Sequence, residues 1–372
     1  MKWRVFLLPD YRNKFKQEGF KENRFFEVRG LEPEEISEII VELQEKSFRG
    51  EQVFHWLQAQ AVQSWGEMTN LSVHLQEKLA ANFSFTPLKL VEEQISRDGT
   101  RKYLWELADG KRIESVLLFH EGDFTKKRIT LCLSTQVGCP LGCRFCATGK
   151  LRFTRNLTVG EIVSQVLDVT ALQCQREKQF KINNLVYMGM GEPLLNLPVV
   201  LKSIKLLNHK EGQNIGMRRI TVSTCGIVPQ IDRLAAENLD LVLAVSLHAP
   251  NNKLRNQIMP VNKQYPLEEL MSACRRYIAQ TGRRITFEYV LMKGFNDSLR
   301  EAGELAVLLR DLKANLNLIP VNIIARGRFQ RPEPKDVRNF VSFLQKKGIS
   351  AVIREAKGSD IAGACGQLAG GT

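Results

Sequence analysis

The strongest constraint on the fold is a repeated alternation of strand-like and helix-like segments from residue 128 onward. Longer stretches with helical periodicity separate six short runs rich in aliphatic and β-branched residues: RITLCLST, NNLVYMGMG, RRITVSTCG, LVLAVSLHAP, RITFEYVLM and LNLIPVN. Repeated strand–helix units predict a parallel sheet or barrel. Six units are fewer than a full eight-strand barrel needs, so we expect an α/β fold, a partial (β/α)6 barrel over residues 128–357.

The residues before and after this region have a different character. Residues 1–90 predict a small helical accessory domain, in which LEPEEISEIIVELQEK begins with Pro33 in a first turn. The basic balance of the chain favours an RNA-docking role for this domain over a purely structural one. Residues 91–127 predict a strand hairpin linker that turns at Asp109-Gly110. Residues 358–372 form a glycine-rich tail that carries Cys365, and glycine gives such a segment backbone freedom.

Polar residues collect at the ends of the predicted strands. In parallel α/β folds, ligands bind at the carboxyl ends of the strands. The residues at these ends are Cys139, Gly191, Glu192, Ser223, Ser246, Leu247, His248 and Asn322.

Composition and charge restrict the environment and the partners. The net charge of +13 favours a polyanionic partner such as nucleic acid. No apolar run approaches the roughly 18 residues of a membrane span, and the apolar piece Val5–Leu8 is too short for a signal-peptide core. We therefore expect a cytoplasmic protein with no membrane contact.

Three of the eight cysteines, Cys139, Cys143 and Cys146, lie within the stretch GCPLGCRFCATGK. A closed zinc site needs a fourth ligand, which Cys132 could supply, although Cys132 lies seven residues upstream in an apolar run and no second CxxC follows. Three thiolates on a four-iron cluster would instead leave one iron open for a substrate. We interpret the remaining cysteines of the central region as structural: Cys174, Cys225 and Cys274.

The CxxxCxxC loop after a first strand resembles that of the radical S-adenosylmethionine (SAM) enzymes. Together with YMGMGEPLLN, ITVSTCGIVP, AVSLHAP, LIPVN and DIAGACGQLAG, it resembles the RlmN/Cfr family of RNA methyltransferases. The resemblance implies one [4Fe-4S] cluster on Cys139, Cys143 and Cys146, and SAM on the open iron. It also implies methylation of adenosine 2503 in 23S rRNA, at C2 for the RlmN type or at C8 for the Cfr type. GEPLLN favours the RlmN type, which often also methylates adenosine 37 of tRNA.

The same resemblance assigns roles to three further residues. Cys365 takes a methyl group from one SAM, and a 5′-deoxyadenosyl radical from a second SAM removes hydrogen from that methyl group. The resulting carbon radical adds to adenine, Glu114 removes the ring proton, and Cys132 attacks the Cys365 sulfur to release the product and leave a disulfide. From the local pattern alone, Glu114 would be an outward-facing strand carboxylate and Cys132 a buried strand thiol.

The resemblance also implies the cofactor contacts and the partners. MGMGEP, with Gly191 and Glu192, receives the amino group of SAM, and Phe145 packs near its adenine. Ser223, Ser246, Leu247, His248 and Asn322 match the other SAM contacts. The partners are 23S rRNA, tRNA and a flavodoxin-like one-electron reductant, and the protein is expected to be a monomer. The candidate phosphate contacts are Lys150, Arg152, Arg155, Arg326, Arg328 and Arg331.

The sequence features also fit a protein of a second class. A non-catalytic iron–sulfur or zinc protein that binds RNA would share the basic charge and the cysteine loop. It would need neither Cys365 nor the SAM motifs, and both are present in this chain.

Overall fold

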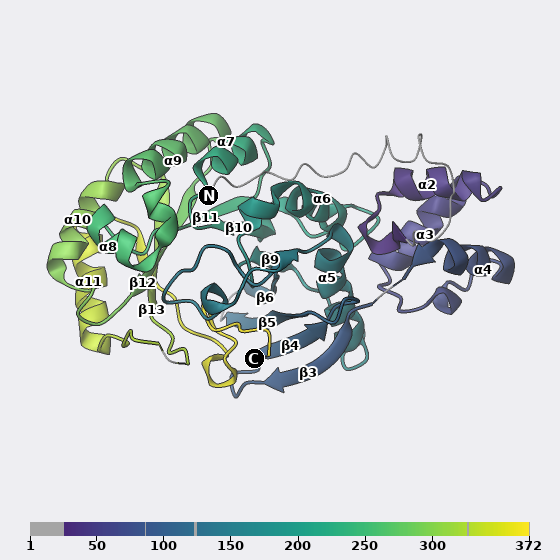
Figure 1. Cartoon of the computed structure of the whole chain (residues 1–372), viewed down its shortest axis with the longest axis horizontal. Helices are drawn as coiled ribbons and strands as arrows, with labels where there is room; N and C mark the ends of the chain where they lie inside the picture. Colours follow the sequence, from purple (N-terminus) through teal and green to yellow (C-terminus); the bar gives the residue numbers. More distant parts are fainter. Residues whose placement is uncertain (1–25, 86, 123–124, 326, 372) are drawn as a thin grey trace.

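A computed structural model describes residues 26–85, 87–122, 125–325 and 327–371. Its centre is a ten-stranded sheet in the order β14-β13-β12-β11-β10-β9-β6-β5-β4-β3 (Figure 1). All six predicted strands are confirmed: β6 (Thr125–Cys132), β9 (Asn184–Tyr187), β10 (Ile220–Thr224), β11 (Val242–Ser246), β12 (Ile285–Leu291) and β13 (Ala314–Pro320). A seventh parallel strand, β14 (Ala351–Ile353), pairs with β13 and was not predicted from the sequence.

The parallel strands form an open, curved sheet. Neighbours from β6 to β14 all pair in parallel. Five strands separate β6 from β14, yet Cys132 at the end of β6 and Arg354 just after β14 line the same cavity. The sheet therefore curls toward itself without closing, as a partial barrel does, and the strand ends surround a common space.

The predicted hairpin is β4 (Arg101–Glu106) and β5 (Arg112–Gly122), which are antiparallel and flank the Asp109-Gly110 turn. Gly110 has φ +75°, a conformation that glycine adopts without strain. A further strand, β3 (Lys89–Ile95), pairs with β4, and β5 pairs with β6. The segment expected as a linker is thus continuous with the barrel sheet, and it places β5 beside the first barrel strand.

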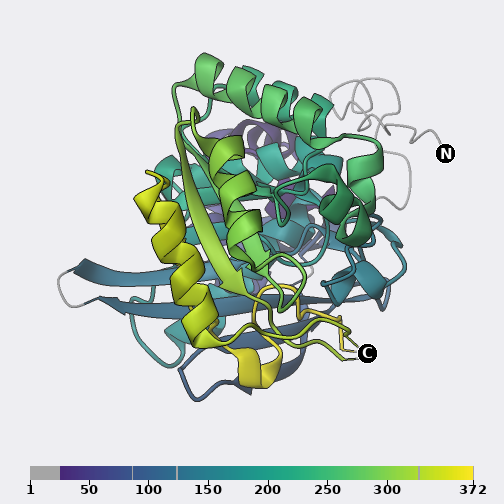
Figure 2. The same ribbon diagram turned by 90° about the vertical axis from the view of Figure 1, so that its left-hand side faces the viewer.

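Helices cover the outside of the parallel strands (Figure 2). Residues on both faces of the strands are buried, as a sheet covered in this way requires; for example, only Thr286 of β12 is not fully buried. The helices are α5 (Val159–Cys174), α6 (Leu197–Asn208), α7 (Val228–Ala236), α8 (Asn252–Ile258), α9 (Leu267–Thr281), α10 (Leu299–Leu309) and α11 (Pro334–Lys346). Within the described residues, no helix is long and apolar enough to cross a membrane. Val5–Leu8 lie outside the described residues.

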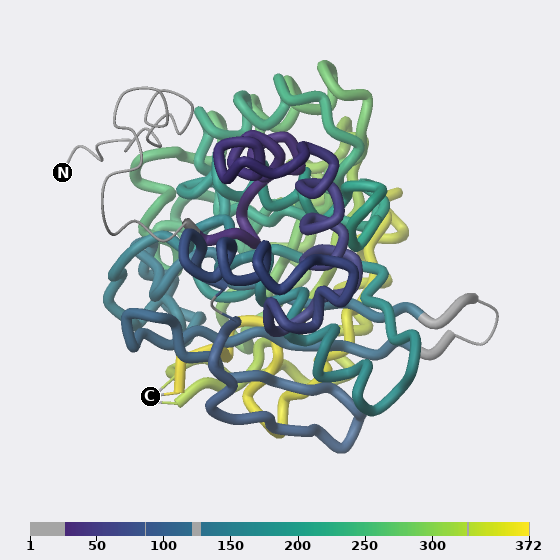
Figure 3. The backbone as a smooth tube through the Cα atoms, turned by 90° about the vertical axis from the view of Figure 1, so that its right-hand side faces the viewer, coloured from purple at the N-terminus to yellow at the C-terminus, as the bar shows by residue number. Residues whose placement is uncertain are grey.

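The predicted N-terminal helical domain is α2 (Pro33–Glu42), α3 (Phe48–Gln58) and α4 (Val73–Asn82), which lie together at one end of the molecule (Figure 1). Seen from that end, the domain lies in front of the barrel (Figure 3). Two short strands, β1 (Phe26–Glu27) and β2 (Phe83–Ser84), pair at its base. Residues 26–84 contain ten acidic and four basic side chains. The positive charge of the chain therefore resides elsewhere, so charge does not support the RNA-docking role expected of these residues.

A buried arginine fastens this domain to the barrel. Arg29, 2% exposed, donates to Asp168 on α5 at 2.6 Å, to Ser164 at 3.2 Å and to the carbonyl of Val62 at 3.0 Å. The backbone N–H of Leu88 donates to the other oxygen of Asp168 at 2.7 Å. In a buried ion pair of this kind, removing one partner leaves the charge of the other buried and uncompensated, which destabilises the protein.

We expect Arg29→Ala to lower the free energy of unfolding by about 3–5 kcal/mol, because it leaves the Asp168 carboxylate buried without its cation. Urea unfolding followed by circular dichroism measures the change. The control is Lys205→Ala, which removes an exposed ion pair to Glu32 between α6 and the same domain. It should cost less than about 1 kcal/mol, and equal losses in the two variants would contradict the prediction.

Candidate active site

The cysteine loop follows a two-residue strand, β7 (Gln136–Val137), beyond the end of β6. It is tightly packed: a side chain at Gly149 would lie 2.6 Å from the carbonyl oxygen of Cys143. The N–H of Arg144 donates to the carbonyl of Ile258 at 2.9 Å, and the N–H of Ala147 donates to that of Gly366 at 2.7 Å. The loop is thus held between the end of α8 and the C-terminal tail.

The three thiols of this loop are the predicted cluster ligands. Burial raises the pKa of Cys139 and of Cys146, so without a metal both would stay protonated. No three His, Cys, Asp or Glu side chains within the described residues converge as the ligands of one metal ion would. In an iron–sulfur cluster each thiolate binds a separate iron, so the thiols of one loop need not meet at a point.

Cys225, which its sequence context predicts to be structural, lies against this loop. Its Sγ is 3.9 Å from that of Cys143, and its N–H donates to Glu192 at 2.7 Å. Arg255, fully buried, donates to the carbonyl oxygens of Cys225 at 2.7 Å and of Ser246 at 3.1 Å. Arg255 therefore ties the ends of β10 and β11 together beside the cysteines, a role that sequence analysis did not predict.

The predicted SAM residues surround the same strand ends. Gly191 has φ +104° and packs so closely on Gln136 that a Cβ would lie 2.6 Å away. Glu192, 2% exposed, accepts from the N–H groups of Cys225 and of Leu194, the latter at 3.1 Å, and burial raises its pKa. Its carboxylate thus fastens the glycine segment to the β10 loop. The hydroxyl of Ser223 donates to the carbonyl of Tyr187 at 3.0 Å.

His248 and the residues next to it are held by β12. The N–H of Val290 donates to His248 Nδ1 at 3.1 Å, and the N–H of Leu247 donates to the carbonyl of Glu288 at 3.0 Å. Burial and nearby Arg255 lower the pKa of His248 to about 3, so the ring is neutral near pH 7. The ring of Phe145 meets that of His248 edge-on, with centroids 4.7 Å apart.

Asn322 offers a polar atom without a partner. Its Nδ2 donates to the carbonyl of Cys365 at 3.0 Å, while its buried Oδ1 accepts no hydrogen bond within the described part of the chain. Buried polar atoms rarely stay unpaired in a complete site. This orphaned acceptor fits a bound ligand with hydrogen-bond donors, as SAM has.

Cys132 and Cys365, which are 233 residues apart in the sequence, line one cavity of about 90 Å³ together with Asn322 and Arg354. Cys132 is buried, whereas Cys365 is exposed, and both are free thiols. The tail that carries Cys365 passes over the cysteine loop, where Thr148 donates to the carbonyl of Leu368 at 2.7 Å.

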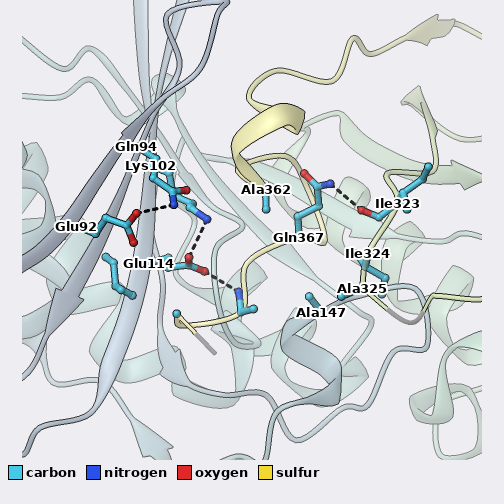
Figure 4. A pocket seen from close by; sticks show the side chains of 13 residues that line it. Glu92, Gln94, Lys102, Glu114, Ala147, Ile323, Ile324, Ala325, Ala362 and Gln367 are labelled. Carbon is cyan, nitrogen blue, oxygen red and sulfur yellow. Dashed lines mark hydrogen bonds and ion pairs between the residues drawn. The ribbon is translucent and has the colours of Figure 1, made fainter.

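Glu114 is buried, not outward-facing as its local pattern suggests: it is 2% exposed and lines a neighbouring cavity of about 410 Å³ (Figure 4). One oxygen lies 3.2 Å from the ammonium of Lys102. The other accepts from the N–H groups of Ala369 and Gly370 at 2.6 and 3.0 Å. The tail therefore spans both cavities, with Cys365 in one and residues 369 and 370 against Glu114 in the other.

The other sequence predictions have mixed outcomes. Cys274 is buried on α9 as expected, but Cys174 is exposed at the end of α5 and does not belong to a core. Arg155 is already engaged by Asp109 and Glu161, each at 2.8 Å. Arg152, Arg328 and Arg331 are exposed, Lys150 donates to the carbonyl of Ala325, and Arg326 lies outside the described residues.

Comparisons with known proteins agree with this geometry. Residues 133–306 match the radical SAM superfamily, and residues 26–84 match the N-terminal domain of ribosomal RNA large subunit methyltransferases. A crystal structure of a radical SAM methyltransferase from Sphaerobacter thermophilus superposes with a TM-score of 0.88 at 44% identity, covering 93% of this chain and all of that one. The fold and the cysteine loop therefore define a radical SAM enzyme, which uses SAM and an iron–sulfur cluster.

Two relatives identify the family. Probable dual-specificity RNA methyltransferases RlmN from Heliobacterium modesticaldum and Thermotoga maritima are 51% and 49% identical to this chain. The alignments cover 92% and 91% of this chain, and 89% and 96% of the relatives. The chain belongs to the RlmN family of radical SAM RNA methyltransferases. This membership sets aside the non-catalytic RNA-binding alternative.

Proposed function

We propose that the protein methylates C2 of adenosine 2503 in 23S rRNA, and adenosine 37 of tRNA, through a methyl group carried on Cys365. The observation that supports this most is the meeting of Cys132 and Cys365 in one cavity, with Glu114 bonded to the same tail four and five residues beyond Cys365. The name of the relatives, dual-specificity RNA methyltransferase, agrees with more than one RNA substrate, and the match to the N-terminal domain of ribosomal RNA large subunit methyltransferases supports rRNA as one of them.

The cofactors in this proposal are one [4Fe-4S] cluster, held by Cys139, Cys143 and Cys146, and two SAM molecules per turnover. When bound, they supply one electron at a time, the methyl group and a radical able to remove hydrogen. The residues for SAM are Gly191, Glu192, Ser223, Ser246, Leu247, His248 and Asn322. Neutral His248 and the free Oδ1 of Asn322 are hydrogen-bonding groups that a polar cofactor can use.

Each of three residues of the chain then has a distinct task. The Cys365 sulfur holds the one-carbon unit next to adenine. After this unit has added to the ring carbon as a radical, the adduct must lose one electron, which the one-electron cofactor would take back, and one proton, which the Glu114 carboxylate takes from the ring carbon. Cys132 loses its proton and attacks the Cys365 sulfur. An S–S bond forms, the S–CH₂ bond breaks, and its electron pair stays on the carbon, which takes up a proton to become the methyl group. An external thiol must then reduce the disulfide before the next turnover.

The partners follow from this chemistry. We propose a flavodoxin-like one-electron donor, a monomeric enzyme and action in the cytoplasm, where ribosomal and transfer RNA are found. The N-terminal domain is proposed to dock RNA because of its match to the rRNA methyltransferase N-terminal domain, not because of its charge. The excess of positive charge outside residues 26–84 supports phosphate contacts made by other parts of the chain.

The test of this function is the identity of the methylated nucleoside. We expect the reconstituted enzyme, given SAM and a reductant, to convert rRNA fragments and tRNA into products that contain 2-methyladenosine, measured by liquid chromatography with mass spectrometry. The alternative is Cfr-type methylation of the same rRNA adenosine. A product that contains only 8-methyladenosine would establish this alternative and reject the proposal.

A further inference from the structure

Arg354 has no assigned role, yet its side chain lines the cavity that Cys132 and Cys365 share. It follows β14 directly, and its N–H donates to the carbonyl of Leu318 on β13 at 2.8 Å. The short strand β14 therefore fixes its backbone on the opposite edge of the parallel strands from Cys132. The tail brings Cys365 to the same cavity.

The guanidinium of Arg354 is not neutralised by a close ion pair. Its ion-pair partner in the described part of the chain is Glu288, with Nη1 and Oε1 3.7 Å apart. Asn317 also donates to that oxygen at 2.9 Å, and Nη1 lies 3.9 Å from the sulfur of Met188. A guanidinium has five N–H donors, so most of its donors have no partner within the described part of the chain, and its side chain is among those that line the cavity.

The thiols in this cavity need such a cation. Only a thiolate attacks sulfur, and burial raises the pKa of Cys132 to about 12. A negative charge on Cys365 raises the pKa of Cys132 further, whereas the positive charge of Arg354 lowers the pKa of Cys132. The same interactions raise the pKa of Arg354, with Cys365 as the largest cause. Arg354 therefore favours a negative charge on the Cys132 sulfur.

The other charged or titratable side chains along the cavity do not replace Arg354. Burial and the cations around it lower the pKa of His120 to about 4, so that ring is neutral near pH 7. The ammonium of Lys357 donates to the carbonyl of Phe119 at 2.8 Å. Glu355 carries a negative charge, which disfavours a thiolate, and Cys146 is a proposed cluster ligand.

We propose that Arg354 is a positioning residue for the thiol chemistry of Cys132 and Cys365, and that its guanidinium stabilises the Cys132 thiolate as this thiolate attacks the Cys365 sulfur. The place of this attack in turnover rests on the proposed function. The effect on the thiols does not, because it can be measured without RNA or SAM.

The experiment follows one thiol exchange in protein with its cluster reconstituted under anaerobic conditions. All variants carry Cys174→Ser, which removes the exposed thiol on α5. Dithiobis(nitrobenzoate) converts Cys365 into a mixed disulfide with thionitrobenzoate at low pH, where Cys132 stays protonated. When the pH is raised, the Cys132 thiolate attacks Cys365, the Cys132–Cys365 bond forms, and thionitrobenzoate leaves with the electron pair and is measured by its yellow colour.

We expect Arg354→Gln to slow this release about tenfold near neutral pH, and to move the rise of rate with pH upward by about one unit, because a nearby cation shifts a pKa by at least that much. Arg354→Lys keeps the charge and should stay within about threefold of the parent. Arg338→Gln removes an equal charge from the exposed face of α11 and should change nothing.

The outcomes separate this proposal from the proposed function. Cys132→Ala should release no thionitrobenzoate, and release at the parent rate would remove its resolving role and reject that part of the function. If Cys132→Ala stalls but Arg354→Gln matches Arg338→Gln, only the role of Arg354 is overturned. If Arg354→Lys is as slow as Arg354→Gln, Arg354 acts through packing, and the electrostatic role is also rejected.

Discussion

Replacing Cys365 with alanine should abolish RNA methylation, whereas replacing Cys132 should trap the enzyme on its RNA. Cys365→Ala has no sulfur to carry the one-carbon unit, so we expect product to fall by more than about a thousandfold and no covalent complex to form. Cys132→Ala still carries the unit and attacks adenine. It then lacks the thiolate that breaks the S–CH₂ bond, and water cannot readily replace it.

Denaturing gels of protein purified with cellular RNA measure the difference, since only a covalent adduct survives denaturation and disappears with nuclease. Each variant has a matched control in the chain. Cys174→Ala removes another exposed thiol and Cys274→Ala another buried one, and both should turn over normally. Normal turnover by Cys132→Ala, or equal trapping of RNA by Cys365→Ala, would reverse the assigned roles.

The sequence predicted the barrel well because parallel strands that are buried on both faces have a strong local pattern. Six aliphatic runs became six neighbouring strands in chain order. The strand β14 escaped detection because three residues are too few to show a periodicity. This omission matters, because β14 places Arg354 beside the two reactive cysteines.

Side-chain environments that depend on distant segments could not be predicted. Glu114 has the local pattern of an outward-facing residue, and a tail 255 residues later covers it. The position of Cys225 near Cys143 depends on how the β10 loop meets the cysteine loop. A buried arginine such as Arg255 is recognisable only when the carbonyl oxygens that it binds are known. The resemblance to a family supplied roles for the cysteines, but not these contacts.

The cysteine loop should hold an iron–sulfur cluster through three thiolates, and the nearby thiol of Cys225 should not be a fourth ligand. Cys143→Ala should remove the iron from anaerobically reconstituted protein and abolish SAM cleavage. Only two thiolates would then bind the cluster, so the protein would no longer retain it. Iron analysis and the visible absorption of the cluster measure the first effect, and release of 5′-deoxyadenosine measures the second. Stoichiometric zinc without iron would instead support a closed structural site.

Cys225→Ser is the sharper test, because its sulfur lies only 3.9 Å from that of Cys143. If Cys225 were a ligand, the cluster would be closed by four thiolates, and SAM would have no iron to bind. We therefore expect Cys225→Ser to keep its iron and its SAM cleavage within about threefold of the parent, since serine preserves the size and the backbone N–H that binds Glu192. If Cys225→Ser lost as much iron as Cys143→Ala, Cys225 would be a fourth cluster ligand, and the prediction of an open iron for SAM would be wrong.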